Sequence, residues 1–184
     1  TKMKRLIQIA TTFSFIVILI SCTAQTNKKV GGQDTKINLT PPAGKAIAAF
    51  AEGCFWCSEH IFEAVIGVDS TVSGYAGGTA PNPTYELVNT ETTGHAESIL
   101  VYYDPKLISY AELLKVFFTS HDPTTPDRQG PDRGNSYRSI IFYKTPEEKT
   151  LAEQAKRDFA KAFKNPIVSE IKPLTEFNKA EGYH

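Results

Sequence analysis

Two cysteines three positions apart carry the most obvious chemistry in this sequence, Cys54 and Cys57 in the stretch GCFWCSEH. Such a pair can close into a disulfide, supply half of a zinc site, or pack as two small apolar side chains. The chain has no second CxxC and no close pair of histidines to complete a zinc site. Phe55 and Trp56 stand between the thiols, and two large rings beside a nucleophile suit a small apolar group of a substrate. We therefore favour redox chemistry.

Cys54 is predicted to lie where a strand turns into a helix. The apolar run 46–51 (AIAAFA) is typical of a buried strand, Gly53 interrupts it, and apolar residues then recur at helical spacing over 54–65. Free N–H groups at a helix start stabilise an anion, so we expect a lowered pKa for the Cys54 thiol. Cys57 follows one turn later on the same face. A thioredoxin-like disulfide oxidoreductase remains an alternative, because a CxxC near a β-α-β pattern is typical of that class.

The rest of the pattern predicts an α+β domain. Further strands are expected at 68–75, 97–103, 137–143 and 167–171, and further helices at 110–119 and 146–163. Two segments rich in Gly, Pro, Asn and Asp, 77–94 and 121–135, are predicted to be long loops, which are the natural place for a site. The order β-α-β-β-α-β-α-β predicts a two-layer sandwich, in which helices pack on one mixed sheet with a ferredoxin-like core.

The first 44 residues are predicted to lie outside this domain. Three basic residues precede the apolar run 13–20, which is typical of a secretory signal and short for a bilayer-spanning helix. The run ends in Leu-Ile-Ser-Cys, which resembles a bacterial lipobox with Cys22 as the lipidated residue; a plain signal peptide cut near Ala24 is the alternative. We predict a lipoprotein-type signal peptide over 1–21, a flexible tether over 22–44 and the domain over 45–184.

Composition and charge narrow the possible partners. The chain of 184 residues is 41% hydrophobic and 22% charged, which are ordinary values for one globular domain. Its formal net charge is zero and it has no basic run, so we expect no nucleic-acid partner. A lipid anchor would hold the protein in the bacterial cell envelope, outside the cytoplasm, where disulfides can form.

Several motifs occur in the order found in peptide methionine sulfoxide reductases of the A type, and the chain resembles that family over 45–184. They are GCFWC, SGYAGG (73–78), PNPTYELV (81–88), TGHAES (93–98), VYYDP (101–105), HDPTTPDRQGPDRGNSYRS (121–139) and AEGYH (180–184). The resemblance implies an α+β two-layer fold. It also implies reduction of the S epimer of methionine sulfoxide, free or in proteins, with no metal or organic cofactor.

The resemblance assigns roles to individual residues. Cys54 would attack the sulfoxide sulfur and become a sulfenic acid, and Glu97 would protonate the sulfoxide oxygen if burial raises its pKa. Taken alone, Glu97 would be interpreted as an exposed charge on a strand. The expected substrate-binding residues are Phe55 and Trp56 around the methyl group, Tyr85 and Tyr137 on the sulfoxide oxygen, and Asp132 near the thiol.

Recycling is expected to depend on Cys57. Many relatives have glycine at this position and resolve the sulfenic acid with later cysteines, whereas this sequence has no cysteine after Cys57. The resemblance to CFWC variants implies a Cys54–Cys57 disulfide that a thioredoxin-like donor reduces. We expect a monomer that repairs oxidised envelope proteins.

Two other functions stay open at this point, the disulfide oxidoreductase and a non-enzymatic module that binds methionine-rich or oxidised segments. Only the sulfoxide reductase uses Glu97, Tyr85 and Tyr137 together.

Overall fold

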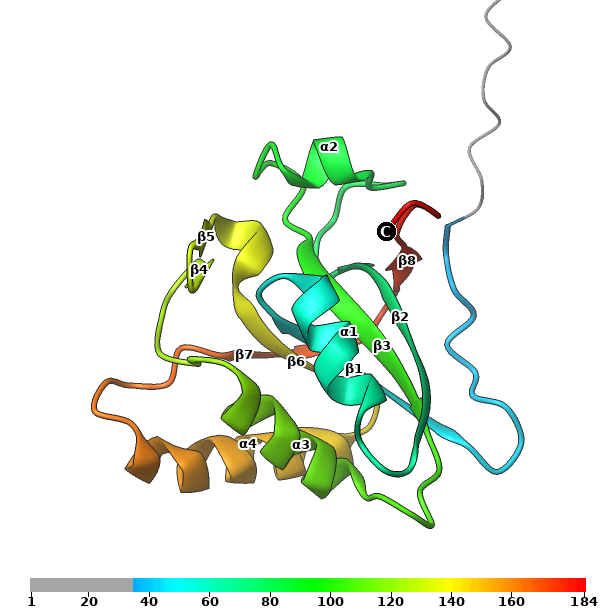
Figure 1. Ribbon diagram of the computed structural model, residues 1–184, viewed down its shortest axis with the longest axis vertical. Helices are drawn as coiled ribbons and strands as arrows, with labels where there is room; N and C mark the ends of the chain where they lie inside the picture. Colours follow the sequence, from blue (N-terminus) through cyan, green and yellow to red (C-terminus); the bar gives the residue numbers. More distant parts are fainter. Residues whose placement is uncertain (1–34) are drawn as a thin grey trace, which may run out of the picture. The chain divides into compact units, whose positions relative to one another are not determined.

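The computed structural model describes residues 35–184 (Figure 1). The predicted signal peptide and the predicted lipidation of Cys22 lie outside these residues. Within them, no helix is both long enough and apolar enough to cross a membrane.

Six strands form one sheet in the order β7-β6-β1-β3-β2-β8. Neighbouring strands within β6-β1-β3-β2 are antiparallel, and their β-α-β-β-α-β connection is the ferredoxin-like arrangement. Strand β7 runs parallel to β6, so the sheet is mixed. The predicted fold class is thereby confirmed. The bounds are Ala46–Glu52 (β1), Val68–Ala76 (β2), Ala96–Tyr103 (β3), Ser139–Tyr143 (β6), Glu170–Pro173 (β7) and Asn178–Lys179 (β8).

Three helices pack on one face of this sheet: α1 (Phe55–Glu63), α3 (Tyr110–Ser120) and α4 (Pro146–Phe159). Capping residues in the sequence mark the N-termini of α3 and α4. Ser109 and Glu112 form a capping box at α3, and Thr145 caps α4 ahead of Pro146. The α-helical geometry ends at Phe159, and a 3-10 turn over Ala160–Ala162 completes the predicted segment.

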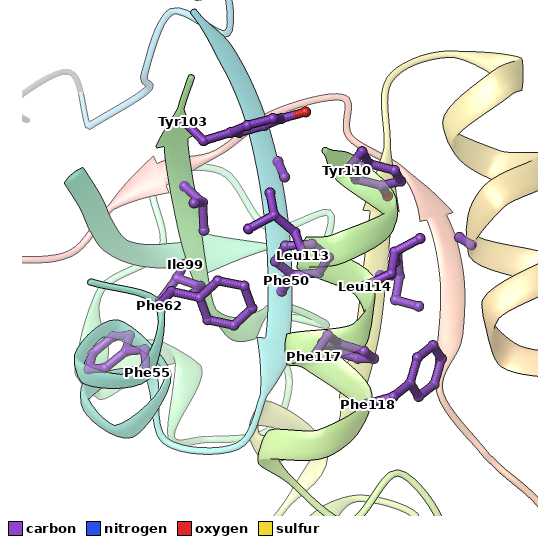
Figure 2. Close-up of a cluster of buried hydrophobic side chains, with 14 of the residues drawn as sticks. Phe50, Phe55, Phe62, Ile99, Tyr103, Tyr110, Leu113, Leu114, Phe117 and Phe118 are labelled. Atoms are coloured by element: carbon purple, nitrogen blue, oxygen red, sulfur yellow. The ribbon is translucent and has the colours of Figure 1, made fainter. Parts of the chain in front are cut away.

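The core between the helices and the sheet is built around Phe50 of β1 (Figure 2). The centroid of its ring lies 5.2 Å from that of Phe62 in α1 and 5.4 Å from that of Phe117 in α3. All three side chains are fully buried, so separating them would expose a large apolar area to water. Because only two residues separate β1 from α1, this packing also sets the direction of the turn that carries Cys54.

The opposite face of the sheet is covered by chain from both ends of the domain. Leu174 and Phe177 pack there, and Ile37 and Leu39 lie against the same cluster. The Lys179 N–H donates to the Thr35 carbonyl at 2.7 Å, and the Ile37 N–H donates to the Phe177 carbonyl at 2.9 Å. For residues 35–39 the structure therefore differs from the predicted flexible tether. Apolar side chains at alternate positions place this short segment on the sheet.

The remaining differences concern short elements. The last predicted strand, 167–171, lies instead at Glu170–Pro173, and the two-residue strand β8 is too short to give a sequence pattern. The first long loop contains helix α2 (Tyr85–Val88). The second contains a small hairpin of β4 (Arg128–Gln129) and β5 (Asp132–Arg133), followed by a 3-10 helix over Asn135–Tyr137.

The turn before Cys54 requires glycine. Gly53 has φ +106°, and a Cβ added there would lie 2.6 Å from the Cβ of Gln129 in the hairpin. We expect Gly53→Ala to lower the free energy of unfolding by about 1–3 kcal/mol, because strain at positive φ adds to this clash. Urea-induced unfolding measures the loss. Gly130→Ala is the matched control, since its φ is +56° and a Cβ there meets nothing within 4 Å. Equal losses in both variants would contradict the contact with Gln129.

Candidate active site

Cys54 occupies the N-cap position of α1, directly after β1. Its side chain caps no N–H group of the helix, and its thiol is half-buried and free. Its carbonyl accepts the first helical hydrogen bonds, from the N–H of Cys57 at 3.1 Å and of Ser58 at 3.3 Å. The thiol is therefore available for chemistry at a helix start, as the sequence predicted.

The first N–H of α1 is bound by a side chain from another strand. The Phe55 N–H donates to Oε2 of Glu97 at 3.0 Å, and Glu97 lies on β3 with a relative exposure of 2%. Burial raises the pKa of Glu97 to about 7; the Phe55 hydrogen bond works against this rise, and the charge of Asp132 adds to it. Glu97 is thus a buried acid that still holds its proton in roughly half of the molecules near pH 7.

The predicted lowering of the Cys54 pKa is wrong. Burial raises the pKa of this thiol, and the charges of Glu97 and Cys57 raise it further. The N–H groups of Trp56 and Cys57 do act in the expected direction, because they lower the pKa. Their effect at the helix start is smaller than the loss of water around the sulfur, which the sequence pattern does not report.

Tyr137 shows that the other predicted groups gather around the same point. Its pKa is raised to about 12, first by burial and then by the charges of Glu97, Tyr85, Asp132 and Cys54. Asp132 comes from the β4–β5 hairpin, and Tyr137 ends the 3-10 helix that follows it. Four separate segments therefore contribute to one site.

The two long loops are tied to each other by Glu91. Its carboxylate accepts hydrogen bonds from the N–H and the hydroxyl of Ser136 at 3.1 and 2.8 Å, and its carbonyl accepts from the Asn135 side chain at 2.8 Å. These contacts hold the 3-10 helix of Tyr137 against the loop of Tyr85. Hydrogen bonds between the two loops therefore help to position Tyr137.

The two aromatic residues between the cysteines differ in exposure. Trp56 is 54% exposed, whereas Phe55 is 1% exposed and packs on Tyr75 with ring centroids 5.9 Å apart. The centroids of Phe55 and Trp56 lie 6.1 Å apart. Only Trp56 offers an open face to a substrate, and Phe55 supports it from the core.

Two residues of the final motif, Glu181 and His184, also lie at the site, although their sequence pattern predicted no role for them. The Glu181 carboxylate accepts from the Tyr85 N–H and from the Tyr75 hydroxyl, both at 2.9 Å. The His184 ring lies against Tyr85, Phe55 and Trp56, with centroids 4.9, 5.0 and 5.7 Å away. In the sequence only the motif AEGYH marks Glu181 and His184, because no periodic apolar pattern surrounds them.

The candidate reacting groups are thus a half-buried thiol, an exposed second thiol and a buried acid. Cys57 is exposed in the first turn of α1. Among residues 35–184, no three His, Cys, Asp or Glu side chains are arranged to hold a metal ion. The arrangement can transfer one proton and two electrons at sulfur.

Comparison with known proteins gives a consistent result. The family model described as "Peptide methionine sulfoxide reductase" matches residues 46–184. The peptide methionine sulfoxide reductase MsrA of Methanosarcina acetivorans is 50% identical over 163 residues, which cover 88% of this chain and 87% of that protein.

Solved structures agree with the sequence match. Reduced Mxr1 from Saccharomyces cerevisiae has a TM-score of 0.75 and 34% identity, covering 82% of this chain and 86% of that one. Mxr1 in complex with Trx2 has a TM-score of 0.59 and 27% identity, covering 80% of this chain and 94% of that one. With its fold and its sequence in agreement, the chain belongs to the peptide methionine sulfoxide reductase family.

Proposed function

We propose that Cys54, Glu97 and Cys57 act in succession to reduce the S epimer of methionine sulfoxide, free or in proteins. Reduction of methionine sulfoxide with recycling by thioredoxin is the activity of the family to which the chain belongs. The observation that carries the residue assignment is the Phe55–Glu97 hydrogen bond, which holds a buried acid beside the N-cap thiol.

In the first step Cys54 takes the oxygen from the sulfoxide. Its sulfur bonds to the substrate sulfur and Glu97 protonates the sulfoxide oxygen. The oxygen then bonds to the Cys54 sulfur, while the substrate's sulfur–oxygen bond and the bond between the two sulfurs break. Over the whole step the thiol hydrogen and the sulfoxide oxygen end on Cys54 as a sulfenic acid. Methionine leaves, reduced by two electrons, and Cys54 is oxidised by two electrons.

The side chains around Cys54 and Glu97 bind the substrate in this mechanism. Trp56 receives the methyl group on its open face, supported by Phe55. Tyr137 keeps its hydroxyl proton at neutral pH, because its pKa is about 12, and can donate it to the sulfoxide oxygen together with Tyr85. Asp132 holds water or substrate near the thiol.

In the second step Cys57 resolves the sulfenic acid. The Cys57 sulfur bonds to the Cys54 sulfur, the S–OH bond of Cys54 breaks, and water leaves. A thioredoxin-like dithiol then reduces the disulfide. The exposure of Cys57 supports this order, because an incoming reductant can reach its sulfur from solvent.

We also propose that the protein is a lipid-anchored monomer of the bacterial cell envelope, held by Cys22 on the extracytoplasmic side. The support is the sequence of the first 22 residues. Its reductant would then lie outside the cytoplasm as well.

Replacement of the acid tests the first step. We expect Glu97→Gln to slow methionine formation in a single turnover by about 100-fold or more, because the amide cannot protonate the oxygen. The amide oxygen still accepts from the Phe55 N–H, so the fold is retained. Glu86→Gln, on an exposed acid of α2, is the control and should react like the wild type. An unchanged rate of methionine formation in Glu97→Gln would contradict the role of Glu97, and insulin reduction without methionine formation by the wild type would indicate a disulfide oxidoreductase.

Glu97→Gln also tests the raised pKa of Glu97, through the pH dependence of the free energy of unfolding. Below about pH 4.5 Glu97 is protonated in both folded and unfolded chains, so wild type and Glu97→Gln respond alike to pH. Between about pH 4.5 and 7 the unfolded chain loses this proton while the folded wild type keeps it, so the free energy of unfolding of the wild type falls relative to that of Glu97→Gln and levels off above about pH 7. We expect a relative loss of up to about 3 kcal/mol between pH 4.5 and 8, measured by urea-induced unfolding.

Removal of the second thiol tests the resolving step. Cys57→Ser should form one methionine per enzyme at the wild-type rate and then stop when thioredoxin is the donor. Mass spectrometry should find a sulfenic acid on Cys54 in this variant and a disulfide in the wild type. Sustained turnover of Cys57→Ser with thioredoxin would show that another group resolves Cys54.

Replacement of Cys22 tests the anchor. In a bacterial host Cys22→Ala should move the protein from the membrane fraction to the soluble fraction. Its reductase activity should not change. Continued membrane attachment of Cys22→Ala would contradict lipidation at this position.

A further inference from the structure

A second buried carboxyl, Glu52, lies at the end of β1, two residues before Cys54, and the reaction above does not use it. Its side chain is 2% exposed. In the β1–β3 register Phe50 lies opposite Ile99, and both side chains belong to the helix-facing cluster. Side chains alternate along a strand, so Glu52 and Glu97 also point to the face that α1 covers. Two buried acids therefore flank the start of this helix.

Glu52 connects three elements at this point. The Ser120 hydroxyl, at the end of α3, donates to Oε2 of Glu52 at 2.8 Å. The Ser58 hydroxyl in α1 is the second hydrogen-bonding partner of the carboxyl. The same Ser58 hydroxyl lies 3.4 Å from the carbonyl oxygen of Cys54. A chain of polar contacts thus runs from α3 through Glu52 and Ser58 to the backbone of the nucleophile.

The nearest base, His121, does not neutralise Glu52. Its Nδ1 lies 3.5 Å from Oε2 of Glu52 but only 2.7 Å from the Phe117 carbonyl, which can only accept. The Nδ1 proton is therefore used there. Its Nε2 lies 2.8 Å from the Ser139 hydroxyl, which is bonded at 2.7 Å to the Ser169 hydroxyl. In a neutral ring Nε2 accepts from Ser139, and the serine pair supplies that hydrogen bond.

The other titratable groups around Glu52 also leave it without a cation. Lys156 of α4 donates to the Ser169 carbonyl at 2.6 Å, at the far end of the serine pair. Glu97 on β3, Asp122 after α3, and Cys54 carry negative charge or none. In the part of the chain that the structure describes, no Lys or Arg lies within ion-pair distance of Glu52. Burial accordingly raises the pKa of Glu52 to about 8 and lowers that of His121 to about 4.

An uncharged carboxyl fits these contacts better than a carboxylate. It has one oxygen that accepts from Ser120 and one O–H that donates to Ser58. The O–H of Ser58 then remains for the Cys54 carbonyl. We propose that Glu52 is a positioning residue for Cys54, an uncharged acid that joins the end of β1 to Ser58 of α1 and Ser120 of α3 and so fixes the first turn of the helix.

This arrangement limits the reactivity of the Cys54 thiol at alkaline pH. When Glu52 ionises, it can no longer donate to Ser58, and a buried negative charge appears two residues from Cys54. Both changes oppose the Cys54 thiolate, because like charge disfavours ionisation and the N–H groups of Trp56 and Cys57 lose their alignment. The proton on Glu52 therefore controls the reactivity of a residue that it does not touch.

The test is the rate of Cys54 alkylation by iodoacetamide between pH 6 and 9.5, measured by peptide mass spectrometry on the full chain carrying Cys57→Ser. An amide has the donor and acceptor of an uncharged acid. The alkylation rate of Glu52→Gln should therefore lie within about twofold of the rate of the Cys57→Ser background at pH 6.5. At pH 9 it should exceed the background rate by about threefold or more, because the background then carries an ionised Glu52. Glu52→Ala should be about tenfold slower at pH 6.5, because the helix start is no longer held. Ser169→Ala, a buried change that leaves Glu52 and its two serines in place, is the control and should follow the background at every pH.

Two outcomes would overturn the proposal. If the alkylation rate of Glu52→Gln follows that of the background at every pH up to 9.5, ionisation of Glu52 does not affect Cys54. A Glu52→Gln rate as low as that of Glu52→Ala would show that the charged form is the one that holds the turn. The proposal rests on Cys54 as the nucleophile, and a methionine-formation assay on the wild type tests that separately. A wild type that forms no methionine would reject the proposed function, whereas alkylation still reports on Glu52.

Discussion

The hydrogen bond from the Phe55 N–H to the Glu97 carboxyl is the contact on which the rest of the site depends. A helix start leaves several N–H groups without partners, and the usual solution is a side chain at the N-cap. Here the N-cap is Cys54, whose thiol must stay free, so a strand neighbour supplies the acceptor. One bond thereby satisfies the helix, orients the acid and joins β3 to the turn of the nucleophile.

Burial then decides how the acid and the thiol share protons. It raises the pKa of Glu97 to about 7 and also raises the pKa of Cys54, so neither group is fully prepared for its part at neutral pH. The pair of ionised Glu97 and Cys54 thiol carries the same number of protons as the pair of protonated Glu97 and Cys54 thiolate. Moving one proton between the two groups therefore reaches the reactive arrangement without exchange with water. The helix start matters here by stabilising the thiolate during this transfer rather than by maintaining it at rest.

The sequence was sufficient for the fold, and the structure brings the predicted site residues together; what the sequence did not predict has physical reasons. Phe50 lies in the apolar run that predicted the first strand, and Phe117 lies in the segment predicted as a helix, so the layers of the sandwich could be predicted. The expected pKa of Cys54 was wrong in direction, since it depends on burial, which is a property of the whole fold. Glu52, Glu181 and His184 were missed as parts of the site because their partners lie on elements distant in sequence.

In the proposed reaction, the role of each thiol matches its exposure. Cys54 is half-buried beside Glu97, an environment that suits oxygen transfer away from bulk water, and Cys57 is exposed in the first helical turn. A disulfide between them would place one sulfur in the site and the other at the surface, where a large donor can reach it. Substrate and reductant would then use different sides of the same helical turn. Two buried acids reach the backbone of that turn: Glu97 through the Phe55 N–H, and Glu52 through Ser58.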